Sequence, residues 1–147
     1  MNRCPQHVFQ VLTKRADRIM ELNDTLRWTS NIWMGVTVEN TSYYRRIDQL
    51  RKCNAKIKFV SCEPLLGSVK DMNLEGIDWV IVGGESGRSP RPLDKSWVLE
   101  IREKCTERDI PFFFKQWGGT NKNKNGRLLE GKEYNERPFI SNEMPIA

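Results

Sequence analysis

The stretch that decides the fold is WVIVGGESGRSPRP, residues 79–92. Four apolar residues run into two glycines, a single carboxylate at Glu85 and a basic loop broken by prolines. A short, wholly apolar run favours a strand that is buried on both faces, as in a parallel sheet covered by helices. Glycines let a backbone approach a ligand closely. The stretch therefore predicts a buried strand whose end is either an ordinary loop or one edge of a site.

Strand-like and helix-like segments alternate on both sides of this stretch. The predicted strands cover 7–13, 32–38, 56–66, 77–84 and 110–119, and the predicted helices cover 16–27, 41–53 and 95–108. This alternation is typical of βαβ units. We predict an α/β fold with a partial (β/α) barrel, in which a mostly parallel sheet of about five strands in sequence order carries its helices on one side.

Two segments depart from the alternation. Residues 67–76 are too short and polar for a good helix, which predicts a turn-rich connection with a short helical piece. Beyond Gly119 the chain is rich in Asn and Lys and is interrupted by proline. We therefore predict a barrel domain over 1–120 and a polar C-terminal arm over 121–147 that ends loosely on the surface.

Length and composition exclude several classes of protein. The chain has 147 residues, 38% hydrophobic and 29% charged, which suits one ordinary domain. No apolar run approaches the ~20 residues that span a membrane, and the N-terminus lacks the apolar core of a signal peptide. We expect a cytoplasmic protein that has no membrane partner.

The cysteines and the single histidine do not predict a metal site. Cys4, Cys53, Cys62 and Cys105 are too dispersed for a CxxC pair, and we expect free thiols. Cys4 and His7 alone do not supply the four ligands of a zinc site. We predict no metal and no cofactor bound through these residues.

The net charge of +5 lies mainly in the first half of the chain. Residues 1–76 hold 12 Lys and Arg against 8 Asp and Glu, and residues 77–147 hold 12 against 11. An excess of this size is compatible with a nucleic-acid partner and also with an ordinary solvated surface.

Charged residues recur where each predicted strand ends. Lys14, Glu39, Glu63, Glu85 and Lys115 follow one another at intervals of 25, 24, 22 and 30 residues, about one βα unit each. Ligands of parallel α/β folds bind at the carboxyl ends of the strands, where the loops converge. We predict that these five side chains, called the charged ring below, point toward one cavity at the same end of the sheet.

Further polar residues at the strand ends complete a set of candidates for the ligand pocket. The set consists of Lys14, Thr37, Glu39, Asn40, Ser61, Glu63, Gly83, Gly84, Glu85, Ser86, Arg88, Arg91, Lys115, Gln116 and Trp117. Arg88 and Arg91 lie in a proline-stiffened loop that suits phosphate or carboxylate recognition, although loop arginines are also commonly only solvated. Trp117 either stacks on a planar ligand or closes the end of the barrel. No catalytic residue is assigned.

Five motifs in this order carry a resemblance to a known family. FQVLTKR, GVTVEN, SCEPLLG, WVIVGGESG followed by RP, and PFFFKQWGG extend from Phe9 to Gly119. They resemble the phage gp thirty-seven/gp sixty-eight family of phage and bacterial proteins, which is itself regarded as similar to radical S-adenosylmethionine enzymes with a partial (β/α) barrel. The resemblance implies a barrel-like fold with an active face at the strand ends.

The chain also departs from that family. Members typically carry an upstream segment with three closely spaced cysteines that ligate a [4Fe–4S] cluster, and this sequence has no such triplet. S-adenosylmethionine and the cluster are therefore implied only for members that have those cysteines. We expect a chain that begins near the third strand of a family barrel, either naturally truncated or part of a longer protein.

Three functions are compatible with the sequence, and whether the chain is an enzyme is left open. The first is the C-terminal portion of a radical-SAM-like phage or bacterial protein, with a charged pocket and no catalysis of its own. The first alternative is a phage or mobile-element accessory module that binds nucleic acid. The second is an enzyme that holds magnesium or manganese through Glu39, Glu63 and Glu85.

The first strand predicts self-association. A barrel that begins at HVFQVLT exposes an edge where Val8, Phe9, Val11 and Leu12 carry no charge. Unpaired apolar edges associate unless they are blocked. We expect a two-fold dimer, unless the missing N-terminal half or the C-terminal arm covers this surface.

Overall fold

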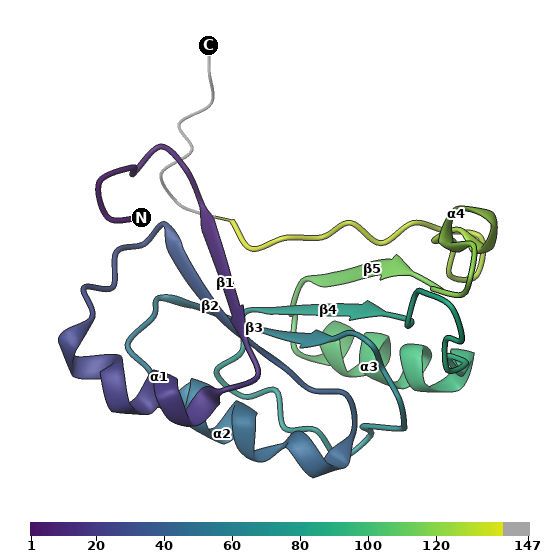
Figure 1. The fold of residues 1–147 in the computed structure, drawn as a ribbon, viewed down its shortest axis with the longest axis horizontal. Helices are drawn as coiled ribbons and strands as arrows, with labels where there is room; N and C mark the ends of the chain where they lie inside the picture. The colour runs from purple at the N-terminus through teal and green to yellow at the C-terminus, as the bar shows by residue number, and fades with distance from the viewer. Residues whose placement is uncertain (140–147) are drawn as a thin grey trace.

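A five-stranded, all-parallel sheet forms the centre of the computed structural model, which describes residues 1–139. The strands follow the order of the sequence and are β1 (Phe9–Thr13), β2 (Ile32–Thr37), β3 (Ile57–Cys62), β4 (Trp79–Gly83) and β5 (Phe112–Gln116). The sheet twists strongly, so that β1 crosses the view steeply while β4 and β5 run across it (Figure 1). The predicted α/β fold with parallel strands in sequence order is confirmed.

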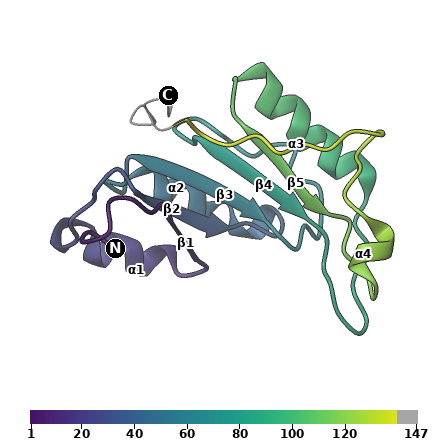
Figure 2. The same cartoon turned by 90° about the horizontal axis from the view of Figure 1, so that it is seen from above.

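The helices pack on one face of this sheet. They are α1 (Ala16–Leu22), α2 (Arg45–Arg51) and α3 (Lys95–Glu107), with the short helices η1 (Asn23–Thr25), η2 (Thr41–Tyr43) and α4 (Lys122–Asn125). Ile19 of α1, Leu50 of α2 and Ile101 of α3 lie in one buried cluster with Val36 and Val82 of the strands. From above, α1 and α2 lie at one end of the sheet and α3 at the other (Figure 2).

The first helix is shorter than its apolar spacing predicted. It ends at Leu22 and continues as the 3₁₀ turn Asn23–Thr25. Asn, Asp and Thr have low helix propensity because their side chains compete for backbone hydrogen bonds. The indole Nε1 of Trp28 donates to the carbonyl of Asn23 at 3.1 Å, which secures the early end of the helix.

Aromatic side chains fill the opposite, concave face of the sheet. Trp33, Phe59 and Trp79 are buried there in a cluster of their own. The rings of Trp33 and Trp79 meet edge to face with centroids 5.9 Å apart. Gly35 lies beside them because any Cβ at this position would collide with the ring of Phe59. The sheet therefore has two separate apolar layers, one under the helices and one inside the curve.

The connection between β3 and β4 is turn-rich, as predicted, but residues 67–76 contain no helical piece. Val69, Met72 and Leu74 are nevertheless fully buried in the main core. Arg51 of α2 donates to the carbonyls of Asn73 and Glu75, which replaces the backbone hydrogen bonds that a helix would supply.

The chain beyond α4 returns along the outer edge of β5 (Figures 1 and 2). The backbone N–H of Phe114 donates to Tyr134 at 3.0 Å, and that of Glu136 donates to Phe112 at 3.3 Å. Leu129 is fully buried in the main core. The arm thus covers the edge of β5, whereas β1, at the other edge, pairs only with β2 within residues 1–139.

Among these same residues, none of the helices has both the length and the apolar character needed to cross a membrane.

Candidate functional site

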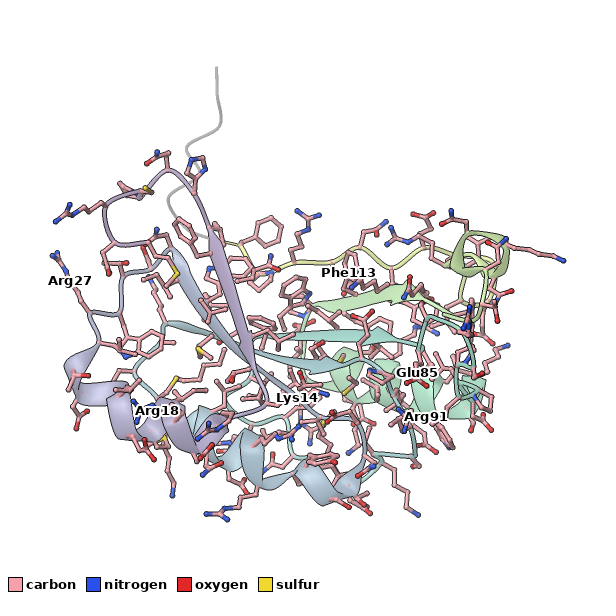
Figure 3. The ribbon with its side chains drawn as sticks, in the orientation of Figure 1. Lys14, Arg18, Arg27, Glu85, Arg91 and Phe113 are labelled. Atoms are coloured by element: carbon pink, nitrogen blue, oxygen red, sulfur yellow. The ribbon has the colours of Figure 1, made fainter. Side chains whose placement is uncertain are left out.

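The residues of the charged ring lie at the carboxyl ends of the parallel strands, which all meet at the same end of the sheet; this end is called the carboxyl edge. Lys14 follows β1, and Glu85 and Arg91 lie beyond the end of β4 (Figure 3). In the structure the ring is divided into three ion-paired groups, each with its own glutamate: Glu39, Glu63 and Glu85.

The first group surrounds Glu39. Lys14 Nζ lies 2.7 Å from one carboxylate oxygen and Arg46 Nη1 lies 2.9 Å from the other. Arg46 also donates to the carbonyl of Thr37 at 2.7 Å and stacks over the ring of Tyr43. Burial by itself raises the pKa of Glu39, but the hydrogen bond from Lys14, the backbone and the two positive charges outweigh it. The pKa therefore lies below its ordinary value, and this carboxylate is ionised.

Arg46 was not among the sequence candidates. The sequence gives only a weak indication of its role. Arg46 lies one helical turn after Tyr43, but the adjacent Arg45 has the same side chain, and the sequence does not indicate which of the two faces the strand ends. Asn40, which was a candidate, has a local role: its side chain accepts from the N–H of Ser42 and caps η2.

The second group surrounds Glu63. Lys115 Nζ lies 3.0 Å from Glu63 Oε2, and Gln116 Nε2 lies 3.5 Å from Oε1. Gln116 also donates to the hydroxyl of Ser86 at 2.9 Å. A Cβ at Gly83 would lie 3.3 Å from the Glu63 side chain, so glycine leaves the room that this carboxylate occupies. The group therefore joins the ends of three strands.

The third group is the loop that follows GGE. Glu85 accepts from the backbone N–H of Arg91 at 2.8 Å, and the guanidinium adds two further bonds at 2.9 and 2.8 Å. These hydrogen bonds lower the pKa of Glu85 to about 2. Arg88 is exposed on the same loop. Glu85 and Arg91 thus hold the loop closed on itself and leave Arg88 to the solvent.

Backbone contacts between glycines lock the loops after β4 and β5 together. The N–H of Gly119 donates to the carbonyl of Glu85 at 2.7 Å. A Cβ on Gly84 would collide with the carbonyl of Trp117. Trp117 itself packs edge to face on Phe114, and its indole donates to the carbonyl of Leu128 at 2.9 Å. Trp117 thus packs against the core at the end of β5, and its stacking on a planar ligand stays a prediction.

A cavity of about 370 Å³ lies on the concave face below this edge. It is lined by Gln10, Leu12, Phe59, Ser61, Glu63, Trp79, Ile81, Phe113, Lys115 and Arg137. The curve of the sheet brings its two edge strands, β1 and β5, to the same space. Within the charged ring only Glu63 and Lys115 line this cavity, so the prediction that all five point into one cavity is wrong. Lys14 and Glu39 instead pair with each other between the ends of β1 and β2, and Glu85 pairs with Arg91 in its own loop.

Of the remaining candidates, Ser61 lines this cavity and the others lie outside it. Ser61 is buried in β3, and Thr37 is buried at the end of β2. Sequence reasoning missed Gln10, Leu12 and Arg137, because neither an edge strand nor a polar arm signals which surface it will face. A second cavity of about 890 Å³ lies between α3 and the arm and shares Gln10 and Arg137 with the first.

The thiols do not fit an iron–sulfur cluster. Cys53, Cys62 and Cys105 are buried in the helix-side core, and Cys4 lies near the N-terminus. Burial raises the pKa of Cys62 and Cys105, the latter to about 12, which disfavours the thiolates that bind metal. In the part of the chain that the structure describes, no three His, Cys, Asp or Glu side chains are grouped to hold a metal ion. The three ring glutamates are instead each paired with a cation.

Comparison with known proteins gives one match. The family described as "Protein of unknown function (DUF5131)" matches residues 1–138. The chain belongs to this family. The match covers all five strands and most of the arm, so the concave cavity of this DUF5131 member is built wholly from family sequence. No curated protein and no solved structure matches the chain.

Proposed function

We propose that this chain is the ligand-binding, C-terminal portion of a phage or bacterial radical-SAM-like protein, and that its concave cavity holds a small molecule with a planar apolar body. The observation that supports this most strongly is the juxtaposition of an aromatic floor with a paired carboxylate and amine. Phe59, Trp79 and Phe113 form the floor, and Glu63 and Lys115 lie at the carboxyl edge of the sheet.

The cavity has the character of a small-molecule site. Its volume of about 370 Å³ falls within the range of ligand pockets, which are mostly apolar with a few polar groups that fix orientation. Here Gln10 and Ser61 add an amide and a hydroxyl to the charged pair. Such groups orient a ligand through hydrogen bonds while the aromatic rings supply most of the contact area.

The charges at the carboxyl ends of the strands support binding rather than catalysis. Each ring glutamate is paired with a cation, which favours a role for these carboxylates in positioning the cations. The buried thiols do not supply a cluster either. Radical chemistry would therefore require the upstream cysteine segment that the family resemblance implies.

A neutral fluorescent probe tests this function. N-phenyl-1-naphthylamine is aromatic and apolar, and its fluorescence should rise on binding to the cavity. Leu12→Asp should weaken binding, because it places a carboxylate on the cavity wall at a residue 48% exposed and therefore tolerant of substitution. Leu128→Asp is the matched control, since Leu128 is 56% exposed and lies outside the cavity. Equal binding by both variants, or none by the wild type, would rule the proposal out.

Nucleic-acid binding remains the alternative, favoured by the exposed cations of the N-terminal half. Arg18 and Arg27 lie on the α1 side of the molecule, away from Glu85 and Arg91 (Figure 3). Arg18 is paired with Glu21, which reduces the charge available to phosphates. Affinity for a DNA or RNA oligonucleotide that falls steeply as salt increases would favour this alternative over the small-molecule site.

A further inference from the structure

We propose that the ligand of the concave cavity is an aromatic anion, whose negative group lies between Lys115 and Arg137. This inference rests on the proposed function of that cavity and adds the charge of its ligand and a specificity residue, Arg137, supplied by the C-terminal arm.

The charges that line the cavity are unbalanced. Lys115 and Arg137 face a single carboxylate, Glu63. Because Glu63 already accepts from Lys115 at 3.0 Å, Arg137 gives the lining of the cavity an excess of one positive charge. A negatively charged group on the ligand would neutralise it in a space partly shielded from water, where the attraction is stronger than at the open surface.

Lys115 is placed to bind the ligand rather than only to neutralise Glu63. The side chain of Lys115 is 52% exposed, whereas that of Glu63 is 22% exposed, so the amine lies outside the carboxylate. An ammonium group has three donors, and Glu63 uses one of them. Glu63 is therefore a positioning residue, and the remaining donors of Lys115 are available to an anion.

The same layering recurs along the whole carboxyl edge. Lys14 is 59% exposed over a Glu39 that is 7% exposed, and Arg91 is 60% exposed over a Glu85 that is 29% exposed. In each pair the carboxylate is recessed and the cation faces outward. An approaching ligand thus meets positive charge along this edge, which attracts anions toward the cavity.

The arm that carries Arg137 is held in place by the residue before it. The indole Nε1 of Trp79 donates to the carbonyl of Glu136 at 2.9 Å, and Glu136 Oε2 accepts from the N–H of Phe112 at 2.8 Å. Trp79 is also part of the cavity floor. The floor and the arm are therefore anchored to each other at the residue that precedes Arg137, which lines the cavity.

The test compares two probes that differ by one charged group. 8-Anilinonaphthalene-1-sulfonate is the sulfonated counterpart of N-phenyl-1-naphthylamine and carries the same anilinonaphthalene body. The wild type should bind the sulfonate about tenfold more tightly, as expected for hydrogen bonds to a charged group. Arg137→Gln and Lys115→Gln should each remove most of this preference, measured as the ratio of the two affinities within the same variant.

Two further variants separate this role from a general effect of charge. Arg137→Lys retains the cation and should keep most of the preference for the sulfonate. Arg18→Gln removes one positive charge from α1, outside the cavity, and should change neither affinity. Equal affinity of the wild type for the two probes, or an unchanged preference in Arg137→Gln, overturns the anion site while leaving the cavity as a ligand site. Failure of both probes to bind overturns the cavity itself and this inference with it.

Discussion

The exposed ammonium of Lys14 lies 2.7 Å from the buried carboxylate of Glu39 and ties the end of β1 to the loop after β2. Arg46 of α2 holds the second oxygen of the same carboxylate. One buried negative charge therefore joins two strands and a helix at the carboxyl edge. Its removal should loosen this edge more than the loss of any exposed ion pair.

Glu39→Gln should lower the free energy of unfolding by about 2 kcal/mol, because it removes the negative charge with which Lys14 and Arg46 form ion pairs. Urea denaturation followed by circular dichroism measures the change. Glu21→Gln is the control: the Arg18–Glu21 pair is exposed on α1, and its loss should cost less than about 0.5 kcal/mol. Equal effects of the two variants would contradict a structural role for Glu39.

The contribution of Glu39 should also depend on pH. Its folded pKa lies below the ordinary value of 4.5, so near that pH the unfolded chain binds the proton more readily than the folded protein does. The stabilisation is complete above pH 4.5 and decreases as the pH falls through the folded pKa. The difference in stability between wild type and Glu39→Gln should therefore shrink between neutral pH and pH 3 or so. A constant difference would show that the carboxylate charge is not responsible.

Gly84→Ala should destabilise the protein by about 2 kcal/mol, because the new methyl group meets the carbonyl of Trp117 and the loops cannot easily separate. Thermal unfolding measures the loss. Gly67→Ala provides the comparison, since the nearest atom to its Cβ is 3.6 Å away and belongs to the Asn40 side chain. That variant should unfold close to the wild-type temperature, and an equal loss in both would mean that the glycine contact between the loops is unimportant.

Only Cys4 should react quickly with 5,5′-dithiobis(2-nitrobenzoate) in the native protein. Cys4 is partly exposed, whereas Cys53, Cys62 and Cys105 are buried and burial raises the pKa of each. The absorbance of released thionitrobenzoate should show one fast thiol, and the other three should appear after denaturant is added. Rapid release from more than one thiol would contradict the packing of the helix-side core.

The free edge of β1 should make the chain a dimer. Light scattering over a concentration series should give a mass of two chains. Phe9→Lys should reduce this mass toward that of one chain, because a charged side chain on an edge strand disfavours pairing with a second chain. Leu128→Lys, on the arm beside β5, is the matched surface control and should leave the mass unchanged. A wild-type mass of one chain at the highest concentration would rule the dimer out.

The fold could be predicted from local patterns because each strand and helix has a recognisable apolar pattern over a few residues. The apolar run ending at Gly83 and the recurrence of one βα unit were enough to place five parallel strands in order. Several lengths were overestimated: the helix predicted over 41–53 spans only Arg45–Arg51, and the strand predicted over 56–66 spans only Ile57–Cys62. The helix beginning at Ala16 was extended too far because apolar spacing continues past Asn23, although the polar residues there end the helix.

The sequence by itself therefore determined the strands, their order and the edge at which their charged ends meet, since hydrophobic periodicity and chain direction carry that information. Only the tertiary structure decided which charges pair and which face the cavity. Arg46 and Arg91 neutralise glutamates that look alike in the sequence, and Arg137 reaches the concave face from an arm with no apolar pattern. The physical reason is that ion pairing depends on distances in space. Lys115 and Glu63 meet across the curved sheet although 52 positions separate them, and Glu85 meets Arg91, 6 positions away, only because of the path of the loop. No local pattern encodes either distance.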